Sequence, residues 1–210
     1  MLEISSRRPT WAEIDLDNLA FNFRSAKKFI GGDLKYMAVV KADAYGHGSV
    51  ACAKRLEAEG IDWFGVALPE EGVELRHAGI RKLILCLGGF WDGQASVALN
   101  HNLTPVIYQL RQAELLNVEA TTRGTAVSIH VKIDTGMGRI GVRHDQVAEF
   151  ARGLHGLDHL RLEGLMTHFA VADDLKQTGR PDDQRINVEQ DHAAQQAGSL
   201  VKDVRQHLNR

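Results

Sequence analysis

Six short apolar segments recur along the chain, and each is rich in β-branched or large aliphatic residues. Segments of this length and character are typical of parallel strands that are buried on both faces. They cover residues 36–40, 63–68, 81–87, 103–108, 126–133 and 160–166. Because stretches of helical periodicity separate them, the pattern predicts a parallel sheet covered by helices.

The intervening polar segments carry helix start and stop signals. Asp15 or Asp17 can cap a first helix that extends to about residue 29 and ends at Gly31 and Gly32. Further helices are predicted at 49–59, from Pro69, after Gly93, at 111–119, after Asp145 and at 185–208. The alternating pattern at 11–17 predicts one additional short strand.

Two architectures fit this alternation: an open doubly wound sheet, or part of a (β/α)8 barrel. The phosphate loop GxxxxGK[ST] is absent from the sequence. GxGxxG occurs only as GMGRIG at 136–141, after the fifth predicted strand, whereas the dinucleotide fingerprint follows the first strand of its fold. The usual nucleotide loops therefore do not support the open sheet. No repeat of 20–50 residues is present, so a solenoid is not expected.

Composition and charge restrict the class of protein. The 210 residues are 44% hydrophobic and 25% charged, with a formal net charge of −2, so no strong basic field attracts nucleic acid or anionic membrane. No apolar segment approaches the roughly 20 residues that span a bilayer, and the first residues do not resemble a secretory signal. Cys52 and Cys86 show no disulfide framework or metal spacing. We expect a cytoplasmic protein with no nucleic-acid or membrane partner and no metal site.

The segment 38–48, AVVKADAYGHG, places a lysine at the carboxyl end of the first predicted barrel strand. Enzymes built on parallel barrels carry their reacting groups at this edge. Lys41 could instead simply extend to water, as strand-terminal lysines often do. A lysine amine is nucleophilic only when it is neutral, a state that burial or a Schiff base with an aldehyde can supply.

A second polar constellation lies on the fifth predicted strand. Period-two alternation puts His130, Lys132 and Asp134 on one face of this strand, which means either solvent or a lined pocket. A glycine-rich turn at 135–138 follows, and Arg139 comes directly after it. His168 follows the sixth strand, a position where histidine is more often structural than catalytic.

Three segments resemble alanine racemases, which are pyridoxal 5'-phosphate (PLP) enzymes that interconvert L- and D-alanine. AVVKADAYGHG is similar to the family's cofactor-lysine motif, KIDTGMGRIG at 132–141 to its second signature, and THFA at 167–170 to a third segment. The resemblance extends from about residue 8 to at least residue 173. It implies a PLP-binding (β/α)8 TIM-type barrel, a homodimer, and D-alanine production for peptidoglycan.

The resemblance also implies roles for individual residues. Lys41 would be the Schiff-base lysine and the base that transfers a proton, and Tyr45 would contact the cofactor phosphate. Arg139 would donate to the cofactor's phenolic oxygen, and His168 would line the cofactor pocket. Lys132 matches a lysine that is carbamylated in many members, a modification that turns a cation into an anion.

The resemblance also implies that residues 1–210 are an incomplete barrel domain. Six β/α units are two short of closure, and the family's C-terminal β domain has no counterpart here. The family supplies its opposite-face acid as a tyrosine of the partner subunit's C-terminal domain, whereas the tyrosines here are Tyr36, Tyr45 and Tyr108. We therefore expect this chain alone to be a fragment that is poorly folded and inactive.

Three other functions remain open. A non-catalytic single-barrel PLP carrier has a similar length but a different lysine motif. A barrel decarboxylase acting on basic amino acids shares the architecture but lacks the KIDTGMGRIG segment. A Schiff-base aldolase uses a lysine without PLP. Light absorption by the cofactor separates the aldolase from the others, and an assay with L-alanine separates the carrier.

Overall fold

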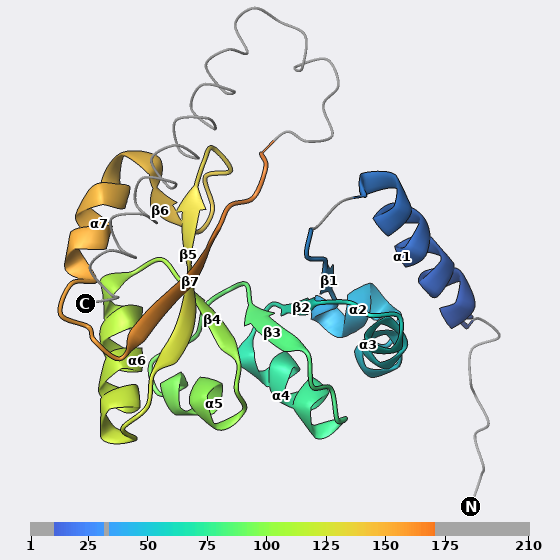
Figure 1. Cartoon of the computed structure of the whole chain (residues 1–210), viewed down its shortest axis with the longest axis horizontal. Coiled ribbons are helices and arrows are strands. Elements are labelled where there is room, and N and C mark those ends of the chain that lie inside the picture. Colours follow the sequence, from blue (N-terminus) through green and yellow to red (C-terminus); the bar gives the residue numbers. More distant parts are fainter. Residues whose placement is uncertain (1–10, 32–33, 171–210) are drawn as a thin grey trace, which may run out of the picture.

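The computed structural model describes residues 11–31 and 34–170. Its centre is a parallel sheet in the order β1-β2-β3-β4-β5, with β7 paired along β5 and the two-residue β6 paired near the carboxyl end of β5 (Figure 1). The strands are β1 (Met37–Val39), β2 (Trp63–Val66), β3 (Leu83–Cys86), β4 (Thr104–Ile107), β5 (Val127–Asp134), β6 (Val142–Arg143) and β7 (Leu160–Met166).

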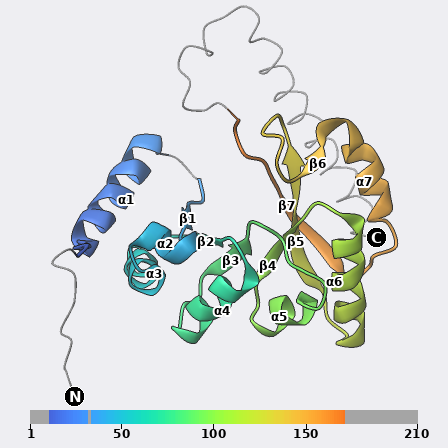
Figure 2. The same cartoon turned by 180° about the vertical axis from the view of Figure 1, so that it is seen from behind.

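Helices connect the successive strands, as the alternation predicted, except β5 and β6, which a loop connects. They are α1 (Leu16–Ile30), α2 (Lys41–Gly46), α3 (Ser49–Ala58), α4 (Pro69–His77), α5 (Ala95–Asn100), α6 (Leu110–Thr122) and α7 (Val147–Gly153), with a 3-10 turn η1 (His144–Gln146) before α7. Figures 1 and 2 show α1 at the β1 end of the sheet and α7 at the end formed by β5, β6 and β7. Parallel neighbours need such crossovers, and helices are the usual form of them.

The two faces of the sheet bury different amounts of apolar surface. The face toward the helices is fully buried and includes Phe64, Ile84, Ile107 and Ile129, packed with helical residues such as Leu116. Each such side chain contributes roughly 1.5–3 kcal/mol through burial. The opposite face carries a smaller cluster, made of Trp63, Leu85 and Val106 with Leu87 and Met166 at its margin. The sheet is therefore stabilised mainly from the helix side.

Two edges of the sheet have one neighbour each among the described residues. β1 pairs with β2 alone, and β7 pairs with β5 alone. A closed barrel has no such edges. Apart from the two-residue β6, six parallel strands form a sheet with two open edges. This arrangement agrees with the predicted incomplete barrel of six β/α units.

The strand expected at 11–17 is wrong. Residues 11–15 have no regular structure, and Trp11 is 79% exposed. Asp15 instead caps α1, since its Oδ1 accepts the backbone N–H of Asp17 at 2.8 Å and of Asn18 at 3.0 Å. An alternating pattern forms a strand only where a partner strand is available, and here the cap stabilises the helix start. The helix expected at 185–208 lies outside the described residues.

Candidate functional site at the carboxyl ends of the strands

β5 carries the polar face that period-two alternation predicted. His130, Lys132 and Asp134 alternate with Val131 and Ile133, and the latter two are buried in the core toward the helices. The polar side chains therefore project from the opposite face of the sheet. Lys41 follows β1, Arg139 follows β5 and His168 follows β7. In a parallel sheet these ends share one edge, so the predicted residues lie on the same side of the molecule.

Lys41 begins a turn whose handedness is opposite to that of an α-helix. Ala42, Asp43, Ala44 and Tyr45 have φ of 50, 54, 52 and 57° with ψ between 35 and 51°. Left-handed backbone costs roughly 1–2 kcal/mol per non-glycine residue. Four consecutive residues in this conformation require external support. Strain of this kind is concentrated at functional sites.

Several hydrogen bonds supply that support. Within the segment, the Ala44 N–H donates to the Val40 carbonyl at 2.9 Å. At its far end, the Ser49 N–H donates to Asp43 Oδ1 at 2.7 Å, which fixes the start of α3. At its near end, the Ala42 N–H donates to a carboxylate oxygen of Glu71, from α4, at 2.7 Å. The sequence pattern predicted that Lys41 lies at the end of a strand, but it indicated neither the left-handed turn nor the bond to Glu71.

The Lys41 amine lies beside Tyr45. Its Nζ is 5.9 Å from the centroid of the Tyr45 ring, within the range of a cation–π contact. The Tyr45 ring itself is 61% exposed. The turn thus presents a lysine and a phenol together at the end of β1, as the motif suggested.

Lys132 is the most deeply buried charged group of the site, with 4% of its surface exposed. Burial lowers the pKa of Lys132, the charges of Arg139 and Lys41 lower it further, and Asp134 acts in the opposite direction. Lys41 and Arg139 therefore both lie within electrostatic range of Lys132, although the three residues come from distant parts of the chain. Such a group of cations around one carboxylate favours an anionic ligand.

Asp134 organises the glycine-rich turn after β5. Its Oδ1 accepts the N–H groups of Gly136 and Gly138, each at 3.1 Å. Burial by itself would raise the pKa of Asp134, but backbone N–H groups of the turn, Gly138 foremost, outweigh it and lower the pKa. Gly141 then passes so close that a Cβ there would lie 2.6 Å from the Asp134 nitrogen. The carboxylate and this close approach together shape the loop that carries Arg139.

Arg139 and His168 come together on the exposed side of this loop. Both line one small cavity together with Lys132, Asp134 and Met137. The loops after β5 and β7 are joined by a hydrogen bond of 2.6 Å between the hydroxyls of Thr135 and Thr167. The structure therefore brings Lys132, Arg139 and His168 to one place, and Lys41 with Tyr45 to its neighbourhood.

His130 lies deeper on the same face of β5. Its ring centroid is 5.4 Å from that of Trp63, and burial lowers its pKa. Its Nε2 is buried without a hydrogen-bond partner among the described residues, and Glu163 Oε2 lies 3.9 Å away. A Cβ at Gly164 would lie 2.6 Å from the His130 ring. The neutral ring is therefore a packing element beneath the cation group.

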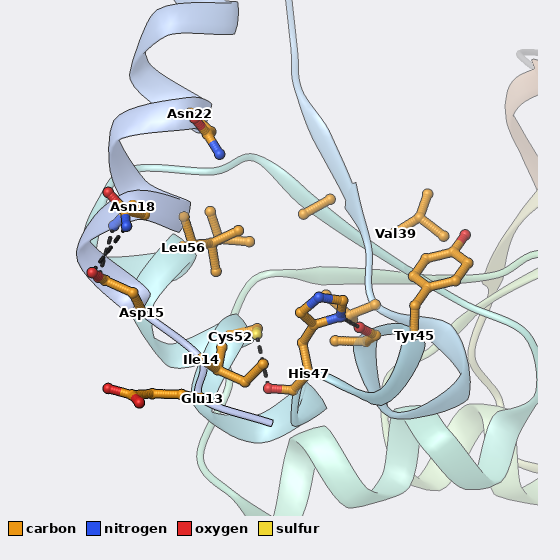
Figure 3. Close-up of a pocket in the computed structure, with 14 residues that line it drawn as sticks. Glu13, Ile14, Asp15, Asn18, Asn22, Val39, Tyr45, His47, Cys52 and Leu56 are labelled. Carbon is orange, nitrogen blue, oxygen red and sulfur yellow. Dashed lines mark hydrogen bonds between the residues drawn. The ribbon is translucent and has the colours of Figure 1, made fainter. Parts of the chain in front are cut away.

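A larger cavity of about 560 Å³ lies elsewhere, between α1 and the Lys41 turn (Figure 3). Tyr45 and His47 line it, but Lys41, Lys132 and Arg139 are not among its lining residues. It borders residues 38–40 at the end of β1, the strand that pairs with β2 alone among the described strands. The cavity thus lies at the open edge of the sheet, whereas Lys41 and Arg139 follow the ends of β1 and β5.

Neither a cluster of candidate metal ligands nor a membrane-spanning helix occurs within residues 11–31 and 34–170. No group of three or more histidine, cysteine, aspartate or glutamate side chains there is placed to hold a metal ion. No helix there is long and apolar enough to cross a membrane.

Known proteins with similar sequences or folds are named as alanine racemases. The chain is 46% identical over 167 residues to the alanine racemase of Halothermothrix orenii and 43% identical over 173 residues to that of Geobacter sulfurreducens. These alignments cover 80% and 82% of this chain but 44% and 45% of the relatives. The chain thus spans about half the length of the curated relatives it matches.

Solved structures agree with the sequence relatives. An alanine racemase of Clostridium difficile 630 in complex with cycloserine has a TM-score of 0.82 and 37% identity, over 93% of this chain and 52% of that one. The alanine racemase of Bacillus anthracis with bound L-Ala-P has a TM-score of 0.80 and 32% identity, over 94% of this chain and 49% of that one. The family model "Alanine racemase, N-terminal domain" matches residues 14–208. This chain belongs to the alanine racemase N-terminal domain family.

Proposed function

We propose that this chain is the PLP-binding barrel portion of an alanine racemase, which interconverts L- and D-alanine and supplies D-alanine for peptidoglycan. The observation that carries the proposal is the convergence of Lys41, Lys132 and Arg139 at one edge of the parallel sheet. The names of the relatives support it, as do the substrate-like ligands named for two solved structures.

The residues present fit the cofactor. PLP is an anionic phosphorylated aldehyde. The site offers an excess of positive charge, and the Lys41 amine lies at its β1 side. When bound, PLP would supply an electron sink for the charge that develops at the substrate α-carbon. Lys41 would hold it covalently and, once released by the substrate amine, would move a proton on one face of that carbon. Tyr45, beside Lys41, would contact the phosphate.

Arg139 and Lys132 would tune the cofactor, and His168 would line its pocket. Arg139 would donate to the phenolic oxygen from the loop that Asp134 shapes. Lys132 in its ordinary form is a buried cation near two others, an unfavourable arrangement. Carbamylation would convert it to an anion that pairs with Arg139. His168 shares the cavity of these two residues and would line the pocket.

Inversion of alanine requires a second proton-transfer group on the opposite face of the substrate. Two tyrosines of this chain are engaged elsewhere, since the Tyr108 hydroxyl donates to the Gly88 carbonyl at 3.1 Å and the Tyr36 hydroxyl to the Gly31 carbonyl at 3.3 Å. Tyr45 lies on the same turn as Lys41. The resemblance to alanine racemases implies that a partner subunit of a homodimer supplies the second group, through a C-terminal β domain outside these 210 residues, and we adopt this assignment.

The remaining assignments follow from this function. Residues 1–210 form one incomplete barrel domain, and the protein acts in the cytoplasm on free alanine, with no nucleic-acid or membrane partner. A non-catalytic PLP carrier is the second candidate, because the described residues hold a lysine site and no free tyrosine opposite it.

The test compares this chain with a chimera in which the C-terminal half of the Halothermothrix orenii relative follows it. Both are supplied with PLP and L-alanine, and D-alanine is followed by chiral analysis. The chimera is expected to racemise alanine as a dimer, and the 210-residue chain negligibly. PLP binding by both without turnover by the chimera would favour the carrier. Rapid turnover by the 210-residue chain as a monomer would contradict the assignment of the second group.

A further inference from the structure

The carboxylate of Glu71 joins two backbone segments that are far apart in the sequence. Its Oε1 accepts the Ala42 N–H at 2.7 Å, and its Oε2 accepts the Ala67 N–H at 2.6 Å and the Leu68 N–H at 3.4 Å. The last two bonds are local, since Glu71 is in the first turn of α4 and caps its own helix. The bond to Ala42 is different, because it reaches across to the residue that follows Lys41.

This bond completes the immobilisation of the Lys41 backbone. On one side of Lys41, the Val40 N–H donates to the Gly65 carbonyl of β2 at 2.8 Å. On the other side, the Ala42 N–H is held by Glu71. Both acceptors, the Gly65 carbonyl and the Glu71 carboxylate, belong to the segment formed by β2 and the start of α4. The Lys41 Cα is thus held between two hydrogen bonds to one neighbouring β/α unit.

The anchor also acts where the backbone is strained. Ala42 is the first of the four residues with left-handed backbone, so its N–H belongs to the peptide at which the strained segment begins. A carboxylate is a stronger acceptor than a neutral group for a backbone N–H. Glu71 therefore offsets part of the cost of the left-handed turn at the residue where it begins.

We infer that Glu71 is a positioning residue for Lys41: its carboxylate holds the left-handed turn and thereby aims the lysine amine at the cofactor. The inference rests on the proposed function in so far as Lys41 is the cofactor lysine. The anchoring of the turn can be measured without any cofactor. The two statements therefore have separate tests.

The chain offers a matched control. Glu57 on α3 also accepts two backbone N–H groups, those of Arg81 and Lys82, each at 2.9 Å. These bonds lie before β3, at the opposite end of the sheet from Lys41. Glu57→Ala therefore removes a comparable helix-to-backbone anchor without touching the turn. Glu71→Gln is the conservative variant, because its amide keeps one acceptor oxygen.

The experiment measures two quantities in the 210-residue chain and in the Glu71→Ala, Glu71→Gln and Glu57→Ala variants. The first is amide hydrogen exchange at Ala42 without cofactor, with the Ile107 amide of β4 as an internal reference. The second is the rate at which added PLP labels Lys41, trapped with borohydride and read by peptide mapping. Glu71→Ala should raise Ala42 exchange by about 10- to 100-fold over the reference and slow the labelling about tenfold. Glu71→Gln should give smaller changes, and Glu57→Ala should change neither ratio.

Each alternative outcome has one meaning. Equal increases in exchange at Ala42 and Ile107 would show general destabilisation and overturn the positioning role, as would labelling of the Glu71 variants at the wild-type rate. If Glu71→Ala does not fold, Glu71→Gln decides between these results. If Ala42 exchange responds but PLP never labels Lys41 in the wild-type chain, the proposed function fails while the anchor stands.

Discussion

The segments after β1 and β5 have the same structural requirement, but their backbones are stabilised differently. Each must present a charged side chain at the carboxyl end of a parallel strand. After β1, four non-glycine residues adopt left-handed backbone and are held by bonds to Val40, Glu71 and Ser49. After β5, glycines at 136, 138 and 141 supply the positive φ, and the Asp134 carboxylate accepts the N–H groups of Gly136 and Gly138.

The difference agrees with the roles proposed for Lys41 and Arg139. The turn after β1 tolerates strain because neighbouring elements support it, so the position of Lys41 depends on the packing of α3 and α4. The loop after β5 has little strain and is tied mainly to its own strand, which leaves Arg139 exposed. A lysine that bonds covalently to a cofactor benefits from a fixed backbone. An arginine that only donates a hydrogen bond depends less on a fixed backbone.

The largest expected effect is the loss of covalent cofactor capture when Lys41 is removed. Lys41→Ala should abolish the borohydride-stable PLP label, because no other amine is held at this strand end on the rigid turn. Peptide mapping of the labelled chain measures this. Lys54→Ala, an exposed lysine of α3, is the control and should label normally. A label on another lysine in the wild-type chain would refute the assignment.

Gly141→Ala tests the close approach in the loop after β5. Its Cβ would lie 2.6 Å from the Asp134 nitrogen at a φ of +143°, so we expect a loss of about 2–4 kcal/mol in the free energy of unfolding. Gly138→Ala is the matched control, with a φ of +67° and no atom within 4 Å of the added Cβ. It should lose only about 1 kcal/mol. Urea denaturation measures both values, and equal losses would show that crowding at Asp134 is unimportant.

Arg139→Ala tests whether the loop after β5 serves the cofactor and not the fold. Arg139 is exposed, so its removal should change the free energy of unfolding by less than about 0.5 kcal/mol. PLP binding should weaken by roughly 1.5–3 kcal/mol, the range for a hydrogen bond to a charged group. The absorption spectrum of the bound cofactor should shift as well. The role of Arg139 is refuted if neither binding nor spectrum changes.

The smallest expected effect concerns the burial of Lys132. Because burial lowers the pKa of Lys132 in the folded chain, the unfolded chain binds more protons between that pKa and about 10.4, and stability rises with pH across this window. In buffer free of carbon dioxide, Lys132→Met should therefore raise the free energy of unfolding by about 1 kcal/mol at pH 7. This gain should shrink as the pH approaches 10.

Urea denaturation from pH 7 to 10 measures the Lys132 effect. Lys54→Met is the control, since Lys54 is exposed and its replacement should have no such pH dependence. A gain from Lys132→Met that stays constant with pH would mean that its origin is packing and not charge. Added bicarbonate that stabilises the wild-type chain but not Lys132→Met would support carbamylation.

Local patterns were sufficient for most of the framework. The six apolar segments became strands, the polar face of β5 was correct, and Pro69 and Gly31 mark helix ends as predicted. These features depend on residues close in sequence, since burial of a strand or capping of a helix is decided by neighbouring positions. The two signatures also placed Lys41 and Arg139 at strand ends without any structure.

The sequence by itself thus determined the order of strands and helices and the residues with reactive chemistry. Tertiary structure alone decided the left-handed turn after Lys41, its anchor on Glu71, the proximity of Lys41 to Lys132, and the two-residue β6. It also decided that residues 11–15 form no strand, because none of the described strands pairs with them and Asp15 caps α1 instead. The physical reason is common to all of these. Strained backbone and clustered cations are unfavourable locally, and only contacts between distant segments offset their cost.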